Sequence, residues 1–156
     1  MARIYLGLGS NLGDKESYLL QAISLIKEQI GPIVARSVFF VSEPWGFESE
    51  HRFLNACVAA ETTIDPKRCL LLMKGIERAL GRPIKASGEY KDRVIDLDIL
   101  FYDDLVMEES DLIIPHPLLQ NRLFVLEPLT EIAPDLIHPV LKKKMKDLLS
   151  DLNGQS

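Results

Sequence analysis

The stretch RVIDLDILFYDD, residues 93–104, is central to the fold because it predicts a buried strand that carries two acidic side chains. Its β-branched and apolar residues are typical of a strand in the core of a sheet. Asp96 and Asp98 interrupt this apolar run. Since side chains alternate along a strand, both carboxylates share one face, roughly 7 Å apart at the backbone. The opposite face is expected to be apolar throughout, formed by Ile95, Leu97, Ile99 and Phe101.

Length, charge and cysteine content limit the classes of protein to consider. A chain of 156 residues is long enough for one domain, residues 1–156, with a sizeable core. The net charge of −5 does not favour binding to nucleic acid or to an anionic membrane. Cys57 and Cys69 lack metal-ligand spacing and are expected to be ordinary core cysteines in a reducing compartment. Without a signal-peptide pattern or an apolar run near ~20 residues, we expect a cytoplasmic protein.

Hydrophobic periodicity predicts an alternation of strands and helices. Strands are expected at 3–10, 33–41, 53–62 and 93–102, and helices at 14–30 and 65–80. A short helical stretch near 121–131 and an amphipathic helix from about 141 to 152 follow. The order strand, helix, strand, strand, helix, strand predicts an α+β fold with a split βαβ arrangement: an antiparallel sheet, helices on one face, and a C-terminal extension.

This topology predicts where a functional site lies. The first two strands run in one direction and the last two in the other, so the ends of the first pair meet the starts of the second pair at one edge. The segments expected there are Ser10 to Gly13, the loop after Val41, Phe53 with Asn55, and Asp96 with Asp98. Because glycines in a strand leave the backbone open to close approach, this face is expected to be a binding floor rather than a second core.

The aspartate pair predicts a cation. Two carboxylates at i and i+2 repel each other unless a cation lies between them, and Mg²⁺ commonly binds one or two carboxylates plus substrate phosphates. Two such ions could clamp both sides of a phosphoryl transfer. The alternative is a strand edge at which Asp96 and Asp98 are simply solvated.

Two further segments carry basic residues. The thirteen-residue stretch GRPIKASGEYKDR, residues 81–93, contains Arg82, Lys85, Lys91 and Arg93, which is typical of a polyphosphate-binding loop and hints at a lid over bound triphosphate. The alternative is an ordinary solvated loop. The segment IIPHPLLQNR, residues 113–122, places a histidine between two prolines. This second signal is weak alone, because such a histidine is more often structural.

The loop SEPWGFESEHR, residues 42–52, places aromatic residues beside Asn55. An asparagine amide offers both a donor and an acceptor. With Phe53 on the same face, Asn55 suits a flat heterocycle that has an amide-like edge. The alternative is a buried asparagine whose hydrogen bonds are satisfied within the protein.

Four segments spread along the chain are distinctive: YLGLGSNLGD (5–14), FLNA (53–56), RVIDLDILFY (93–102) and IPHPLLQNRLFVLEPLTEIAPD (114–135). Through these segments the chain resembles the 6-hydroxymethyl-7,8-dihydropterin pyrophosphokinase family over nearly its whole length. The resemblance implies a ferredoxin-like α+β fold with a βαββαβ core. It also implies an activity in folate biosynthesis: transfer of the pyrophosphoryl group of ATP to the hydroxymethyl oxygen of a pterin alcohol, with two Mg²⁺ ions and release of AMP.

The resemblance further implies roles for individual residues. Asp96 and Asp98 match the metal ligands and, with Arg82 and Arg93, are assigned to catalysis. The residues matched to pterin binding are Ser42, Pro44, Trp45, Gly46, Phe53, Asn55 and Phe124. Those matched to ATP or its phosphates are Glu77, Arg82, Tyr90, Arg93, His116 and Arg122. The implied partners are small molecules only, with no nucleic acid and no membrane, and the oligomeric state stays open.

Two other functions compete with this interpretation. A two-metal nucleotidyl transferase with a palm-like sheet also uses paired carboxylates, but the net charge of −5 argues against a nucleic-acid substrate. A non-catalytic ferredoxin-like module that binds a ligand or RNA is the other. RNA modules of that shape expose stacked aromatic residues on their central strands, whereas this sheet offers carboxylates.

Overall fold

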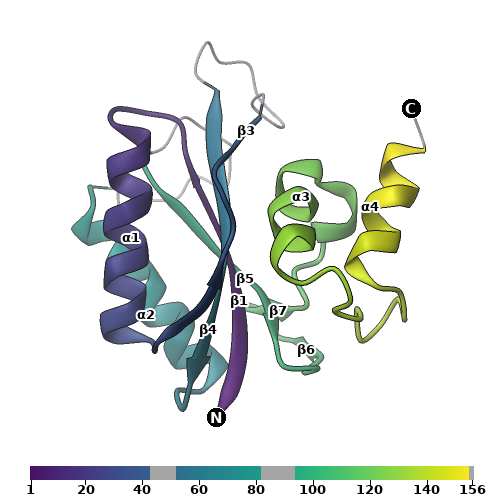
Figure 1. Ribbon diagram of the computed structural model, residues 1–156. Coiled ribbons are helices and arrows are strands. Elements are labelled where there is room, and N and C mark those ends of the chain that lie inside the picture. The colour runs from purple at the N-terminus through teal and green to yellow at the C-terminus, as the bar shows by residue number, and fades with distance from the viewer. Residues whose placement is uncertain (43–51, 82–93, 155–156) are drawn as a thin grey trace.

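The main sheet of the computed structural model, which describes residues 1–42, 52–81 and 94–154, is antiparallel throughout. Its strands are β1 (Ala2–Ser10), β2 (Ile33–Arg36), β3 (Phe40–Ser42), β4 (Phe53–Thr62) and β5 (Asp96–Tyr102), in the order β2-β4-β1-β5 with β3 also paired to β4. A short hairpin of β6 (Met107–Glu108) and β7 (Ile113–Ile114) lies beyond β5 in the sequence. The predicted ferredoxin-like α+β topology and strand directions are therefore confirmed (Figure 1).

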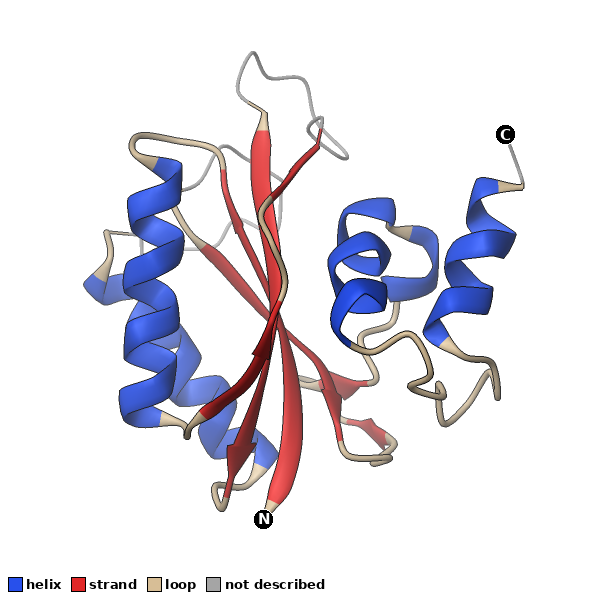
Figure 2. Ribbon diagram, viewed as in Figure 1, coloured by secondary structure: helices blue, strands red, loops and turns tan. Residues whose placement is uncertain are grey.

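Two helices cover one face of the sheet, α1 (Lys15–Gln29) and α2 (Pro66–Ala79) (Figures 1 and 2). Each begins where the sequence provides an aspartate cap. The Asp14 carboxylate accepts the Ser17 N–H at 3.2 Å, and Asp65 accepts the Arg68 N–H at 3.0 Å. The first core lies between these helices and the sheet, with fully buried members that include Ile4, Leu6, Leu19, Ala22, Ile26, Val58, Cys69, Ile76 and Ile95.

The C-terminal extension covers part of the other face. It contains a short 3₁₀ turn η1 (Leu119–Asn121), α3 (Leu123–Ile132) and α4 (Met145–Asn153). These elements enclose a second core, whose members include Tyr5, Cys57, Ala59, Leu100, Phe101, Leu119, Leu126, Leu129 and Met145. The prediction that this face holds no second core is therefore wrong. Its apolar side chains away from the aspartate end need cover, and α3 and α4 supply it.

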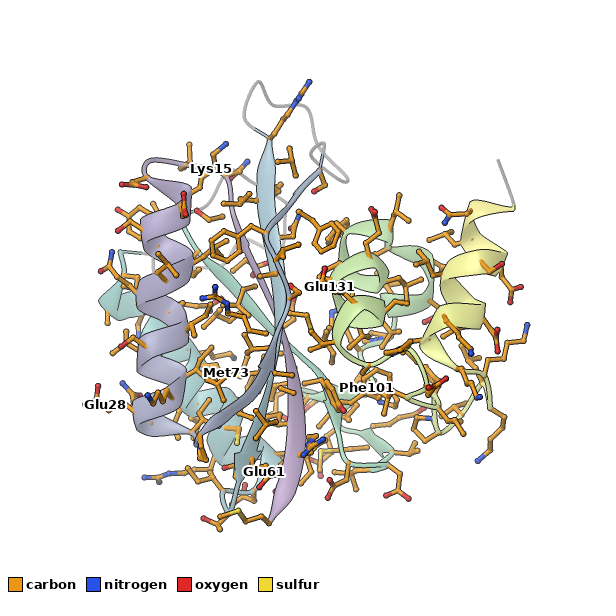
Figure 3. All side chains as sticks on the ribbon, in the orientation of Figure 1. Lys15, Glu28, Glu61, Met73, Phe101 and Glu131 are labelled. Atoms are coloured by element: carbon orange, nitrogen blue, oxygen red, sulfur yellow. The ribbon has the colours of Figure 1, made fainter. Side chains whose placement is uncertain are left out.

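A β-bulge changes the face of the last residues of β5. Leu6 is opposite Ile99 and Tyr5 is opposite Phe101, so Leu100 is an extra residue on β5. Leu100 and Phe101 consequently both enter the second core, and the prediction that Phe101 shares a face with Ile99 is wrong. Figure 3 shows Phe101 on the side of the sheet that faces α3 and α4.

The strand predicted over residues 33–41 is interrupted between β2 and β3. At the break, the Ser37 hydroxyl donates to the Val38 carbonyl at 2.7 Å and accepts the Cys57 N–H at 3.0 Å. The Val38 N–H donates to the carboxylate of Glu131 on α3 at 2.9 Å. Side chains thus add to the one backbone bond that remains here, from the Ser37 N–H to the Cys57 carbonyl at 2.9 Å, and the regular strand is interrupted.

The last helix starts at Met145, later than predicted. Residues before it form a turn around His138, whose Nδ1 accepts the N–H groups of Val140 at 3.2 Å and Leu141 at 3.1 Å. The side chains of Val140 and Leu141 are exposed there instead of lying on a buried helical stripe. Among the described residues, none of the helices is both long and apolar enough to span a membrane.

Candidate active site

Four strands meet at the edge that the sequence predicts. In the register of the sheet, Gly9 lies between Asn55 on β4 and Asp96 on β5. Gly7 is opposite Asp98, and Ser42 at the end of β3 is opposite Phe53. The antiparallel directions therefore bring the two aspartates and the asparagine together across the glycines of β1.

A pocket opens on the second face at this edge, between the strands and the start of α3. Its lining residues are Gly7, Leu8, Gly9, Ser42, Phe53, Asn55, Ala56, Cys57, Asp96, Asp98, Leu100, Arg122, Phe124 and Val125. The predicted floor residues and the predicted carboxylate pair thus share one pocket. The absence of a side chain at Gly9 shapes the floor, because a Cβ there would lie 3.3 Å from Asn55 Oδ1 and 3.4 Å from Phe53 Cδ1.

The carboxamide of Asn55 has a defined orientation. Its Nδ2 donates to the Ser42 hydroxyl at 2.7 Å and, more weakly, to the Phe40 carbonyl at 3.4 Å. Since both bonds use the nitrogen, the oxygen Oδ1 is the atom free to accept from a ligand N–H. Asn55 is only 4% exposed, so a hydrogen bond formed there is shielded from water.

His116 lies beside the aspartate pair as a neutral imidazole. Its Nε2 is 4.0 Å from Asp98 Oδ1, and its Nδ1 accepts the Leu118 N–H at 3.3 Å. Burial lowers the pKa of His116 to about 4, the positive charge of Arg122 adds to this, and the charge of Asp96 opposes it. Because Nδ1 is an acceptor, the ring carries its proton on Nε2, which faces Asp98.

Arg122 and Phe124 bring a cation and a ring to the pocket wall. Arg122 is 4% exposed, and its guanidinium lies 5.6 Å from the centre of the Phe124 ring. Both residues stand at the start of α3, whose buried residues Val125 and Leu126 fix the helix against the sheet. A buried positive charge near two carboxylates suits an anionic ligand.

Glu77 has a different setting from the other predicted residues. It lies near the end of α2, which covers the first face, and is 8% exposed. Its Oε2 accepts the backbone N–H of Leu97 at 2.8 Å. This bond reaches the peptide between Asp96 and Asp98.

The remaining predicted site residues, Pro44, Trp45, Gly46, Arg82, Tyr90 and Arg93, lie outside the described residues, as does the predicted lid. Conversely, Leu100 and Val125 line the pocket, although neither is among the residues predicted for the site. Leu100 could have been found, because it follows Asp96 and Asp98 in the same alternation. Val125 could not, because the pattern that predicts a helix near 121–131 does not show which face of the sheet the helix covers.

The described side chains restrict the chemistry. Cys57 lines the pocket, but burial raises the pKa of its thiol, so it is a poor nucleophile. Within residues 1–42, 52–81 and 94–154 there is no cluster of three or more His, Cys, Asp and Glu suited to a metal ion. A pair of carboxylates alone fits Mg²⁺, which completes its coordination with water and phosphate oxygens.

The fold and this pocket suit the binding of a small, flat ligand beside an anionic, metal-bound group. The model of the 7,8-dihydro-6-hydroxymethylpterin-pyrophosphokinase (HPPK) family matches residues 5–134. The chain is 43% identical over 147 residues to the 2-amino-4-hydroxy-6-hydroxymethyldihydropteridine pyrophosphokinase of Aquifex aeolicus, covering 94% of this chain and 90% of that protein. It is 45% identical over 141 residues to the pyrophosphokinase of the same name from Porphyromonas gingivalis, covering 89% and 95% respectively.

A solved structure of wild-type Plasmodium falciparum HPPK-DHPS shares the fold, with a TM-score of 0.80 at 17% sequence identity. The match covers 99% of this chain and 45% of that longer chain. The chain thus belongs to the 7,8-dihydro-6-hydroxymethylpterin-pyrophosphokinase family. Its reaction is pyrophosphoryl transfer to a hydroxymethyldihydropterin, a step of folate biosynthesis.

Proposed function

We propose that the chain, as one catalytic domain over residues 1–156, transfers the pyrophosphoryl group of ATP to the hydroxymethyl oxygen of 6-hydroxymethyl-7,8-dihydropterin in a Mg²⁺-dependent reaction that releases AMP. The observation that carries this proposal is the single pocket that holds both an amide-and-ring floor, Asn55 with Phe53, and the carboxylate pair Asp96 and Asp98. The end of the pocket with Asn55 and Phe53 suits a pterin, and the end with Asp96 and Asp98 suits a metal–phosphate group.

The pterin would bind flat between two rings. Phe53 lies on the sheet side of the pocket and Phe124 on the α3 side, so a planar heterocycle between them would contact an aromatic face on each side. Asn55 Oδ1 would accept a ring N–H, with Ser42 holding the amide. Pro44, Trp45 and Gly46 would complete this subsite.

Asp96 and Asp98 would hold the magnesium ions. When bound, Mg²⁺ neutralises the triphosphate charge and polarises the attacking hydroxyl. The chain's own residues would position the reactants, because two carboxylates on one face of a strand would hold the metal–triphosphate group beside the pterin subsite.

Basic and polar side chains would bind the phosphates. Arg122 adds a buried positive charge, and the neutral His116 donates a hydrogen bond from Nε2 without adding charge. Arg82 and Arg93, with Tyr90, would come from the basic loop and stabilise negative charge that develops during transfer.

One assay tests the reaction. ATP, Mg²⁺, 6-hydroxymethyl-7,8-dihydropterin and the protein are mixed, and AMP formation is followed with and without EDTA. Pterin-dependent, EDTA-sensitive AMP formation supports the proposal. Release of ADP, or attack at the α-phosphorus, would favour another two-metal transferase, and no turnover with any pterin would favour a non-catalytic ligand-binding module. We further propose that the protein acts in the cytoplasm.

A further inference from the structure

Strand β5 is attached to the rest of the molecule on both sides. On one side it pairs with β1, and in the strand order it is the last strand of the main sheet within the described residues. On the other side its backbone groups need different partners, because an edge strand presents unpaired N–H and C=O groups. Two hydrogen bonds from other parts of the chain supply such partners.

The first attachment is the carboxylate of Glu77, which accepts the Leu97 N–H at 2.8 Å. The second is the backbone of His116, whose N–H donates to the Leu100 carbonyl at 3.0 Å. The attachment from Glu77 lies at the aspartate pair itself, since Leu97 separates Asp96 from Asp98.

Burial of the Glu77 carboxylate is energetically unfavourable unless hydrogen bonds compensate for the lost water. Glu77 is 8% exposed, and a buried carboxylate is tolerated when hydrogen bonds satisfy it. A bond from a backbone N–H to a carboxylate is charge-assisted and about twice as strong as a neutral one. Its direct effect is to fix the peptide that joins Asp96 to Leu97, at the beginning of β5.

We propose that Glu77 is a positioning residue: through the Leu97 N–H it fixes the distance and the direction of the Asp96 and Asp98 carboxylates, and it thereby sets the affinity for metal–nucleotide. This inference rests on the proposed roles of Asp96 and Asp98. It differs from the role implied by resemblance, in which Glu77 contacts ATP directly.

The first measurement is amide hydrogen exchange at Leu97 in the full chain without ligands. Glu77→Gln retains an oxygen that can accept the N–H, so Leu97 should stay protected. Glu77→Ala removes the acceptor, and exchange at Leu97 should accelerate while amides of the first core keep their protection. Arg78→Ala, an exposed neighbour on α2, is the matched control and should leave Leu97 unchanged.

The second measurement separates positioning from direct contact. Calorimetry compares binding of AMP in EDTA with binding of a non-hydrolysable ATP analogue in Mg²⁺. Glu77→Ala should weaken the metal-dependent binding roughly ten- to hundredfold, the usual effect of losing a group that orients a metal ligand. Binding of AMP in EDTA should stay at the wild-type level, and Glu77→Gln should restore most of the loss.

Three results would overturn the inference. Unchanged Leu97 exchange in folded Glu77→Ala would show that the bond does not hold the strand. Equal losses for AMP in EDTA and for the metal-bound analogue would indicate direct nucleotide contact, as would a failure of Glu77→Gln to restore binding. The exchange result at Leu97 does not depend on catalysis, so it stands or falls separately from the proposed reaction.

Discussion

Asp96 and Asp98 are close because side chains alternate along β5 and place both on one face. They line the pocket because β5 pairs in register with the glycines of β1. Neither carboxylate is part of the apolar packing. The Asp98 side chain is 40% exposed, which means that its removal leaves no cavity in either core. A change at Asp98 is therefore expected to affect binding rather than stability.

Asp98→Ala should abolish turnover and leave the fold nearly intact. The change removes one proposed metal ligand and relieves carboxylate repulsion, so the melting temperature should change little while the rate falls roughly a hundredfold or more. Initial rates at saturating Mg²⁺ and thermal unfolding of the same sample check this. The control is Asp104→Ala, an exposed aspartate in the turn after β5, which should keep wild-type activity. Wild-type turnover in folded Asp98→Ala would contradict the metal assignment.

Asn55→Ala should weaken pterin binding more than ATP binding. A desolvated amide that loses its hydrogen bonds to a ligand costs on the order of 1–3 kcal/mol of binding free energy. Ser42→Ala should produce a smaller loss for the same ligand, because Ser42 holds the Asn55 Nδ2 and thereby directs Oδ1 into the pocket. Isothermal calorimetry with each ligand separately makes the comparison. Equal losses for pterin and ATP would mean that Asn55 is structural.

Sequence alone predicted which side chains of the strands meet, because alternation and strand direction depend only on local pattern and topology. Phe53, Asn55, Asp96 and Asp98 share the pocket for that reason. The orientation of the Asn55 amide was beyond reach, since it depends on the Ser42 hydroxyl across the β3–β4 pair.

At the scale of elements, helices α1 and α2 agree with their predicted limits because each carries its own start signal, an aspartate cap. The irregular elements do not. The bulge at Leu100 depends on the register with β1, and the break at Ser37 depends on Cys57 and Glu131. These partners are distant in sequence, so no local pattern could predict either feature.

The helix α3 joins the second core to the pocket, and a mutation in its buried stripe should therefore affect both. Leu126 is 0% exposed in the second core, and Phe124 and Val125, which line the pocket, precede it on the same helix. Leu126→Ala should lower the free energy of unfolding by about 2–5 kcal/mol and also weaken pterin binding, because Phe124 loses its support.

Ile26→Ala provides the matched comparison. Ile26 is also 0% exposed, but it lies on α1 in the first core, on the other side of the sheet. Urea denaturation should show a loss of stability of the same order, about 2–5 kcal/mol. Pterin affinity measured under folded conditions should be unchanged in Ile26→Ala. Equal effects of the two variants on pterin binding would show that α3 has no special link to the pocket.

At the scale of the whole molecule, the order of strands and helices was enough to predict the sheet and its first helical layer. The second layer was not predicted, although the amphipathic C-terminal segment was recognised. A helix with one apolar stripe can cover any exposed apolar surface, and the choice between surfaces depends on the whole face that Cys57, Ala59, Leu100 and Phe101 form. The bulge enlarges this apolar face, because it turns Phe101 toward it.

The turn that connects α3 to α4 contains His138, whose protonation should make the stability of the second helical layer depend on pH. His138 is 6% exposed, its Nδ1 accepts two backbone N–H groups, and its ring lies 5.7 Å from Phe101 in an edge-to-face contact. Burial lowers the pKa of His138 below its ordinary value. Protonation would place a hydrogen on Nδ1 and break both N–H bonds, so the folded state resists the charge.

The sign of the effect follows from linkage. Between the lowered pKa of the folded state and about 6.5, the ordinary value for histidine, the unfolded chain binds more protons than the folded one, so stability falls as the pH falls through that range. His138→Asn keeps an acceptor for the Val140 and Leu141 N–H groups but does not titrate. When the pH is lowered from 7.5 to 5 at constant ionic strength, the melting temperature of the wild type should therefore fall more than that of His138→Asn. His116, whose pKa burial lowers to about 4, adds a decline that both proteins share and that cancels in the difference. A difference that stays constant over this range would show that protonation of His138 is not coupled to folding.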